Sequence, residues 1–562
     1  MKAKTNIYLF SFVGIIFLKL MVEPLVAQTS PSKGPKDEVI AHLNKTIFVS
    51  GETLHFFVSA LLDQKNSPSK IAYAELISRD GEALAQEIIP LNNGSNRGYL
   101  EIPENLVSDH YLIRIYTRMT PIDDTEKGPF HQFITVVNPK KPPLREVRQT
   151  DPSKNTGIIN PSTQNLITLG RNKVNAKDSV QFTLSKTGGT FLGLSVSLQN
   201  PFLIGPLSKP FYRSIYQSGQ IEHRPLPEIY GHIIKGKKLD ENFSEEETYF
   251  LSAHGKQSML FTAKANERGE VYFDLGPFQD YNFLIAQSSN WQSAFNFIIE
   301  YPFLETSFDS DFQFPELVLD ENNREFLQNL VLSKESNRYL EPDEIKSCHE
   351  IVTGFSADHS YLLDDYNRFE DIATTLREYV PQVFVRRQDK KLIYRVFNTP
   401  YNVLYKDLPL MLIDAMPVFD SDALGNFDPT KMKKLDVVAR DFYINQDVFS
   451  GVISFTSFEN DFGGFPLPNN ALYISYKGPQ KARIPVLPRP AKLNDRFYPD
   501  FRSVLYWQPE VVPPSDQKIG FKASATEGQF VIRASYVSHE GQLVTDEKTF
   551  EVGPSAPMGM RD

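Results

Sequence analysis

Residues 409–458 read PLMLIDAMPVFDSDALGNFDPTKMKKLDVVARDFYINQDVFSGVISFTSF. The order predicted along this stretch is a buried strand, a turn, a second short strand, a helix and two more strands. Asp428 followed by Pro429 has the pattern of a helix N-cap with proline at the first helical position. The stretch therefore predicts a small module that combines helices with strands.

This order of elements resembles the plug domain of TonB-dependent outer-membrane receptors, and we expect the module to span residues 361–478. Such plugs normally sit inside a barrel of roughly 22 strands, each about nine to eleven residues long. The residues that follow cannot supply such a barrel, so the resemblance implies a plug-type module without its pore. One departure is Ala415, where the plug pattern usually has glycine. An alanine in such a turn adopts positive φ only at a cost.

The N-terminal residues 1–27 have the order of a secretory signal peptide. Lysines precede an apolar run from Ile7 to Leu18, and residues 25–27 offer a cleavage site before Gln28. An uncleaved membrane anchor is the alternative. We expect an exported protein, in the periplasm or associated with the outer membrane, with no transmembrane segment in the mature chain.

Composition limits the function classes. The formal net charge is -10, and basic residues are dispersed, so nucleic-acid binding is not expected. Cys348 is the single cysteine, which excludes an internal disulfide. The chain is long enough to bury ordinary cores in several domains without such a link.

Strand-like runs dominate the rest of the chain. It contains 42 Phe and 25 Tyr, and 39 Pro and 30 Gly separate its short apolar stretches. This composition favours stacked β-sandwiches. The predicted fold class is mainly β, with tandem sandwiches of macroglobulin-like and transthyretin-like type and one small α+β plug-like domain.

Three segments resemble macroglobulin-like sandwiches. Residues 37–140, with LNKTIFVSGETLHFFVSALL and GYLEIPENLVSDHYLIRIYTR, resemble the MG2 domain of exported proteins of Gram-negative bacteria. Residues 155–205 resemble a second sandwich, and residues 495–555 resemble a C-terminal one.

Two further segments complete the predicted organisation. Residues 226–303, with LPEIYGHIIKGKKL and GEVYFDLGPFQDYNFLIAQ, resemble the carboxypeptidase regulatory-like sandwich, which is not itself catalytic. Residues 314–350 form a predicted helical linker. The apolar residues that fall at helical spacing in it are Phe326, Leu327, Leu330 and Val331.

No local motif predicts catalysis or metal binding. Macroglobulins with a reactive thioester use Cys-x-Glu-Gln, whereas Ile351 follows Glu350 here, so we expect Cys348 to be an inert thiol. The segment 420–425 hints at a calcium loop, but Leu424 replaces the third oxygen ligand. The histidines show no zinc spacing, and no nucleotide-binding or hydrolase signature is present. We predict no catalytic residue, metal ligand or cofactor.

We therefore expect a non-enzymatic envelope protein that binds other proteins or acts as a scaffold. The expected partner is an outer-membrane β-barrel protein or an envelope complex, and the plug-like module is the predicted docking element. The alternatives are a ligand-binding accessory component of a TonB-dependent uptake or outer-membrane secretion system, and a secreted hydrolase. The candidate partner-binding residues, expected in a solvated turn between strands, are Arg386, Arg387, Lys390 and Lys391.

Overall fold

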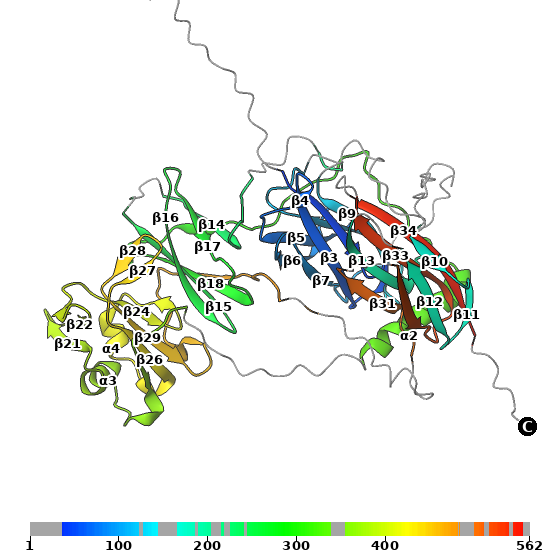
Figure 1. Cartoon of the computed structure of the whole chain (residues 1–562). Coiled ribbons are helices and arrows are strands. Elements are labelled where there is room, and N and C mark those ends of the chain that lie inside the picture. The colour runs from blue at the N-terminus through cyan, green and yellow to red at the C-terminus, as the bar shows by residue number, and fades with distance from the viewer. Residues whose placement is uncertain are drawn as a thin grey trace, which may run out of the picture. The chain divides into compact units, whose positions relative to one another are not determined.

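The computed structural model describes residues 36–122, 128–143, 166–185, 189–203, 215–217, 225–240, 244, 246–338, 354–481, 483, 500–510, 516–538 and 543–554. Within these ranges strands dominate, and the expected mainly β fold is confirmed (Figure 1). None of the described helices is long and apolar enough to cross a membrane. The expected signal peptide and Cys348 lie outside the described residues.

The first sandwich lies within the predicted range 37–140 and has its core between two sheets. One sheet contains β1 (Glu38–Leu43), β3 (Thr53–Leu62), β4 (Lys65–Asn66) and β7 (Ser95–Glu101). The other, in spatial order, contains β2 (Ile47–Val49), β9 (Phe130–Val137), β8 (Asp109–Tyr116), β5 (Ile71–Ile77) and β6 (Ala83–Pro90). Alternate residues of both sheets, such as Phe48 and Phe56, fill the interior.

The second sandwich is assembled from two distant parts of the chain. Its first part comprises β10 (Ile167–Leu169), β11 (Lys173–Asn175), β12 (Ser179–Leu184) and β13 (Thr190–Leu198). Its second part comprises β31 (Val504–Pro509), β32 (Gln517–Lys522), β33 (Gly528–Val537) and β34 (Leu543–Gly553). We call it the split sandwich.

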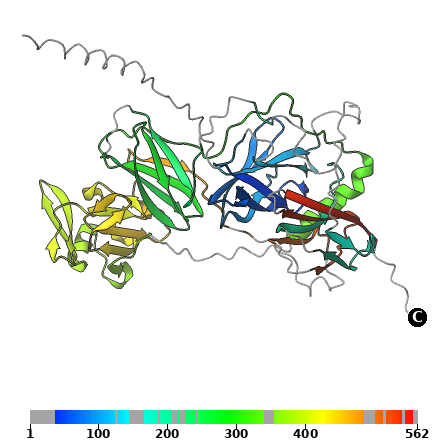
Figure 2. The ribbon, with the colours of Figure 1, turned by 45° about the horizontal axis from the view of Figure 1, so that its top comes forward.

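Strand pairing joins the two parts directly. β13 lies between β33 and β31 in one sheet, and β12 pairs with β32 in the other. Figure 2 shows the teal strands of the first part together with the red strands of the second. The prediction of separate sandwiches at 155–205 and 495–555 is therefore wrong. Each part alone lacks the strands to cover both faces of a core, and their apolar residues share one core, with Leu194 and Val196 beside Phe530 and Ile532.

The predicted helix between sandwiches is present as α2 (Arg324–Arg338), which follows the single turn η3 (Glu321–Asn323). Asp320 caps this turn through a capping box with Asn323. Leu330 is fully buried in the core of the split sandwich. The helix therefore completes that sandwich rather than only linking domains.

The third sandwich lies between the two parts of the split sandwich in sequence. One sheet contains β17 (Glu270–Asp274), β14 (Ile233–Lys238) and β19 (Phe297–Ile299). The other contains β16 (Ser258–Lys264), β15 (Thr248–Gly255), β18 (Tyr281–Ser288) and β30 (Leu472–Ser475). Because β30 belongs here, the predicted module 361–478 extends too far at its C-terminal end.

The α+β module contains the predicted strand, turn, short strand, helix and two further strands, and it adds an unpredicted two-stranded hairpin between the last two. Its main sheet contains β20 (His359–Leu362), β26 (Met432–Val438), β29 (Val452–Ser457), β24 (Leu410–Ile413) and β25 (Met416–Pro417). The remaining elements are η4 (Leu363–Asp365), α3 (Ile372–Tyr379), β21 (Val383–Gln388), β22 (Lys391–Asn398), β23 (Val403–Leu404), α4 (Ser421–Gly425), η5 (Pro429–Lys431), β27 (Phe442–Ile444), β28 (Asp447–Phe449) and η6 (Phe462–Gly464).

Short polar residues set the helix starts in this module. Asp420 caps α4 by accepting from the backbone N–H groups of Asp422 and Ala423, so the segment that hints at a calcium loop opens a helix instead. Asp428 is the predicted cap, but it starts only the 3₁₀ turn η5.

The turn between β24 and β25 has positive φ at both central residues, Asp414 (φ 47°) and Ala415 (φ 67°). This is the backbone of a two-residue hairpin turn that follows the strand twist. The buried Asp414 carboxylate holds the turn by accepting from the Ser457 N–H, the Ser457 hydroxyl and the Phe462 N–H, at 2.8, 2.5 and 2.8 Å.

One face of the main sheet packs against the third sandwich. Phe250 and Leu260 of the sandwich share a core with Leu410, Leu412 and Val452 of the module. This contact fixes one side of the α+β module and leaves its second, smaller sheet away from that core.

Candidate functional site

The four predicted residues are brought together at one hairpin of the α+β module. Asp389 and Lys390 (φ 52° and 67°) form the two-residue turn between β21 and β22. The side chains of Arg386, Arg387, Lys390 and Lys391 are all exposed. The expected turn is therefore limited to Asp389 and Lys390, whereas Arg386 and Arg387 lie in β21 and Lys391 lies in β22.

The register of β21 and β22 divides their side chains between two faces. On the inner face Val383, Leu392, Tyr394 and Val396 are buried in the module core. α3 lies against β21 and α4 against β22. On the outer face the directly opposed pairs are Phe384 with Arg395, Arg386 with Ile393, and Gln388 with Lys391.

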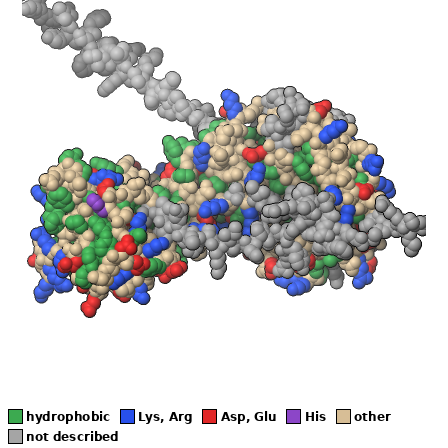
Figure 3. Space-filling view, turned by 60° about the horizontal axis from the view of Figure 1, so that its bottom comes forward, with side chains coloured by type: hydrophobic (Ala, Val, Ile, Leu, Met, Phe, Trp, Pro, Cys, Tyr) green, Lys and Arg blue, Asp and Glu red, His purple; other side chains and the backbone are tan. Residues whose placement is uncertain are grey.

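We call these six residues the outer face of the hairpin. Its side chains are partly or fully exposed, and hydrophobic and basic side chains are visible together on the surface of the α+β module (Figure 3). Phe384 is 50% exposed. The outer face carries three cations and no carboxylate, so it presents apolar area together with positive charge.

Four residues of this face were not predicted from the sequence, and two of them, Phe384 and Arg395, have features that bear on binding. Phe384 is half exposed, and the Nε atom of Arg395 is buried without a hydrogen-bond partner among the described residues. An unpaired guanidinium donor out of contact with water is costly. Period-two alternation places Phe384 on the same face as Arg386, and the register set by the two-residue turn places Arg395 opposite Phe384.

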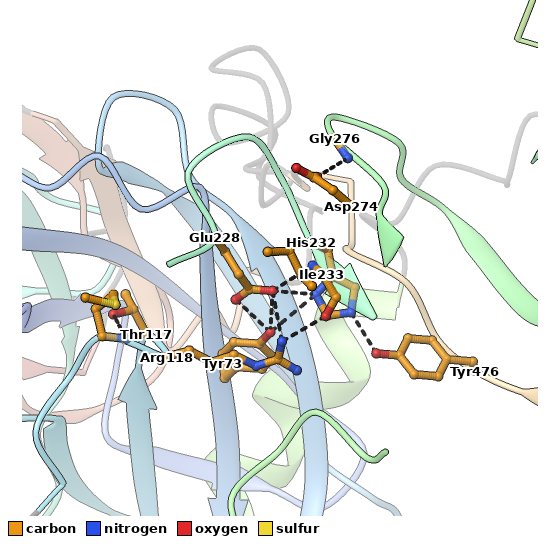
Figure 4. Close-up of polar contacts among 10 residues, drawn as sticks. Tyr73, Thr117, Arg118, Glu228, His232, Ile233, Asp274, Gly276 and Tyr476 are labelled. Atoms are coloured by element: carbon orange, nitrogen blue, oxygen red, sulfur yellow. Dashed lines mark hydrogen bonds and ion pairs between the residues drawn. The ribbon is translucent and has the colours of Figure 1, made fainter. Parts of the chain in front are cut away.

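A second polar cluster is buried between modules (Figure 4). Tyr73 of β5 donates to Glu228 at 2.9 Å, and His232 Nδ1 lies 2.9 Å from the same carboxylate. His232 Nε2 lies 2.7 Å from the Tyr476 hydroxyl, and Arg118 donates to the Ile233 carbonyl at 2.8 Å. The cluster joins the first sandwich, the chain before β14 and the chain after β30.

Charge is balanced in this cluster. Burial raises the pKa of Glu228, but the Arg118 cation and the hydrogen bond from His232 outweigh it, and the pKa of Glu228 is lowered. Burial lowers the pKa of His232. One anion and one cation therefore stay paired at 3.3 Å beside a neutral imidazole.

The cluster resembles an acid–base relay in composition, but its tyrosines, Glu228 and His232 are buried. Tyr73 and His232 are 0% exposed, Glu228 is 1% exposed and Tyr476 is 7% exposed. A substrate cannot contact these groups in this arrangement. The cluster holds segments together.

The chain leaving the third sandwich is held on the first sandwich in a similar way. Arg114 of β8 pairs with Glu75 at 2.5 Å and donates to the Thr306 hydroxyl at 2.6 Å. Arg79 donates to the carbonyl oxygens of Phe314 and Pro315 at 3.0 and 2.7 Å. Both connections of the third sandwich to the first are therefore anchored by arginines.

Metal binding has little geometric support in the described part of the chain. No three His, Cys, Asp or Glu side chains there are grouped as metal ligands. Asp420 is occupied as a helix cap, and Asp422 accepts from the Leu392 N–H at 2.8 Å. Both carboxylates therefore accept hydrogen bonds from backbone N–H groups and hold the local backbone in place.

Comparison with known proteins gives structural similarity only. No family model matches the chain, and no curated protein matches it. Alpha-2-macroglobulin of Salmonella reacted with methylamine is 8% identical over 92% of this chain and 23% of that chain, with a TM-score of 0.15. The native conformation of E. coli alpha-2-macroglobulin is 10% identical over 93% of this chain and 40% of that chain, with a TM-score of 0.22.

This chain spans less than half the length of those alpha-2-macroglobulin chains. The two tandem V-type regions of VCBP3, a v-region-containing chitin binding protein, are 8% identical over 45% of this chain and 92% of that one, with a TM-score of 0.15. TM-scores this low carry no argument about function. The sandwiches are established by their own strand pairing.

Proposed function

We propose that this chain is a non-enzymatic interaction protein of the bacterial cell envelope. It acts as a scaffold whose sandwiches carry the α+β module, and the module docks on an outer-membrane β-barrel protein or complex. The proposal includes export through the N-terminal segment. It also includes the resemblances to MG2, carboxypeptidase regulatory-like and plug domains.

The single observation that carries it is the outer face of the hairpin. The main sheet of the module is fixed to the third sandwich through Phe250 and Leu260, whereas no described element covers the face that contains Phe384 and Arg386. A half-exposed aromatic ring beside guanidinium groups is typical of protein interfaces, where Arg and aromatic residues are enriched. A face used only for solubility would need the charges without the apolar area.

Anchoring of the third sandwich supports a carrier role for the rest of the chain. The Glu228–Arg118 pair holds the entry segment on the first sandwich, and Arg114, which is paired with Glu75 within that sandwich, donates to Thr306 of the exit segment. Removing one partner of a buried ion pair costs several kcal/mol, so these anchors resist opening. A rigid support presents a docking surface at a lower entropic cost than a loose one.

A charge-reversal variant tests the proposal. All four basic residues of the hairpin are changed to Glu, and the tagged protein is used to capture partners from detergent-solubilised membranes of the native organism. Exposed changes alter stability by only a few tenths of a kcal/mol, so the variant should fold. The matched control reverses the same number of exposed Arg and Lys residues elsewhere: Arg171, Lys237, Arg268 and Lys518.

We expect the hairpin variant to lose partners that the wild type and the control retain. Capture of every native partner at wild-type yield by the hairpin variant would place the docking surface elsewhere. In the same cells, recovery of the chain with Met1 intact from the cytoplasm would contradict export.

A further inference from the structure

We infer that the hairpin binds an extended, acidic polypeptide segment, which adds a strand to the free edge of β21. The inference deepens the proposed function and rests on it, because it names the chemistry of the partner at the same surface. Two features of the hairpin carry it: an open row of backbone groups along β21 and the sign and spacing of the side-chain charges.

The pattern of hydrogen-bonded pairs between β21 and β22 shows which backbone groups of β21 point away from β22. The Phe397 N–H donates to the Gln382 carbonyl at 2.8 Å, so 382 and 397 form a hydrogen-bonded pair. In antiparallel sheets such pairs recur at every second residue. Residues 384, 386 and 388 therefore bond to β22, and the N–H and C=O groups of Val385 and Arg387 point toward the opposite edge.

That edge has no partner strand within the described ranges. β21 is the terminal strand of the sheet β21-β22-β23, and no described backbone group bonds to the outer side of Val385 or Arg387. An exposed edge of this kind is a template for an added strand, with the main chain giving affinity and alternate side chains giving specificity.

The side chains define which strand fits. Arg386, Lys391 and Arg395 are the cations of the outer face, Lys390 stands in the turn, and Asp389 is the acid nearest to them in the hairpin. A strand added to the edge of β21 would place carboxylates at every second position directly beside Arg386, with Lys391 and Arg395 of β22 one strand farther, roughly 10 Å away.

The alternation of side chains between the two faces of β21 also predicts apolar residues at every second position of the partner strand. On β21 the side chains of Val383 and Val385 lie on the inner face, toward the module core. The neighbouring strand would continue that face, and β-branched residues suit it. The expected partner segment therefore alternates acidic and β-branched residues.

Two other uses of the hairpin make different predictions. Basic residues on an edge strand also deter aggregation, but that role requires neither the half-exposed Phe384 ring nor the unpaired Arg395 donor. An anionic membrane would use the cations but would leave the amides of Val385 and Arg387 without acceptors. Backbone protection separates strand addition from both.

The test uses the full chain and a capped peptide of about eight residues that alternates Glu and Val, a length typical of one strand. Residue-resolved hydrogen exchange is measured with and without the peptide. We expect the amides of Val385 and Arg387 to become protected, while those of Phe384 and Arg386 change little because they already bond to β22.

Two matched peptides isolate the backbone and charge contributions. The first carries N-methyl groups on alternate amides, which blocks the ladder and keeps the charges. The second alternates Lys and Val. Each should bind roughly tenfold or more weakly, because the first loses the added ladder and the second replaces attraction to Arg386 and the cations behind it with repulsion. The double variant Arg386→Glu with Lys391→Glu should instead prefer the Lys–Val peptide.

Equal binding of the N-methylated peptide, or binding without protection at Val385 and Arg387, would overturn strand addition. Absence of binding by the Glu–Val peptide, or charge-dependent binding to phosphatidylglycerol vesicles in its place, would overturn the choice of an acidic polypeptide. These results leave the proposed function to be judged separately by the membrane capture experiment, which does not depend on the peptide.

Discussion

Acidification should destabilise the third sandwich through one buried histidine, His254 of β15. Its ring is fully buried, stacks on Phe283 at a centroid distance of 4.7 Å, and has a serine hydroxyl within 3.0 Å of each ring nitrogen. Burial lowers the pKa of His254 from 6.5 to about 3. The charged form is therefore disfavoured in the folded chain.

The sign and size of the effect follow from proton linkage. Because the pKa is lower in the folded state, the unfolded chain binds the proton more tightly between about pH 6.5 and about pH 3. The stabilising contribution of the neutral imidazole is complete above pH 6.5 and is lost progressively as the pH falls toward 3. Between pH 8 and pH 5 the loss is about 2 kcal/mol.

The assay compares urea unfolding at these two pH values in the wild type and in His254→Gln. A Trp507→Phe background leaves Trp291, next to β18, as the sole tryptophan reporter of the third sandwich. His254→Gln lowers stability at both pH values because ring packing is lost, but its loss between pH 8 and pH 5 should be smaller by about 2 kcal/mol.

Phe283→Leu is the matched control. It removes the stacked ring and keeps the imidazole, so it should lower stability at both pH values and retain the full pH difference. The reasoning fails if His254→Gln and the wild type lose equal stability on acidification.

Two core substitutions give further expectations. Leu330→Ala should destabilise the split sandwich by about 2–5 kcal/mol, measured by urea unfolding at Trp507 in a Trp291→Phe background, because Leu330 is 0% exposed. Leu332→Ala, at a position that is 45% exposed, should stay within about 0.5 kcal/mol. Ala415→Gly relieves about 1 kcal/mol of backbone strain at φ 67° but removes a buried methyl worth about 0.8 kcal/mol, so its midpoint should barely change. A shift above about 1.5 kcal/mol in either direction would contradict this balance.

The elements that could be predicted from the sequence are those with local signals. α2 has apolar residues at helical spacing, and the turn at Ala415 has the positive φ at which the plug pattern favours glycine. The order of strands in the α+β module follows from short apolar runs separated by turn residues. Each of these signals lies within a few residues of the element that it specifies.

The split sandwich has no such signal. Strand pairing between β13 and β33 depends on segments far apart in the chain, and alternation reports which face of a strand is buried but not which strand lies beside it. The separate sandwiches predicted for the two segments reflect the usual tendency of consecutive strands to be neighbours. Here the third sandwich and the α+β module are inserted between strands that are neighbours in the split sandwich.

Part of the candidate site was predictable for the same reason. Arg386 and Lys390 are exposed because the charged run at the end of this hairpin contains no apolar side chain to bury. The buried cluster was not predictable, since Tyr73, Glu228 and Tyr476 belong to three segments without a shared local pattern. Contacts of that kind become visible only when the segments have been placed side by side.

The interrupted order of the split sandwich also has a consequence for biosynthesis. A ribosome that adds ~5–20 residues per second takes roughly 15–60 s to make the roughly 300 residues between β13 and β31. During that interval β12 and β13 exist without β31, β32 and β33, their partners in the two sheets. Unpaired strand edges invite wrong pairing. A nascent chain stopped anywhere in the insert would therefore expose the strand edges of β12 and β13 that later pair with β31, β32 and β33. A chaperone that holds unfolded chains would have a defined target until translation reaches β33.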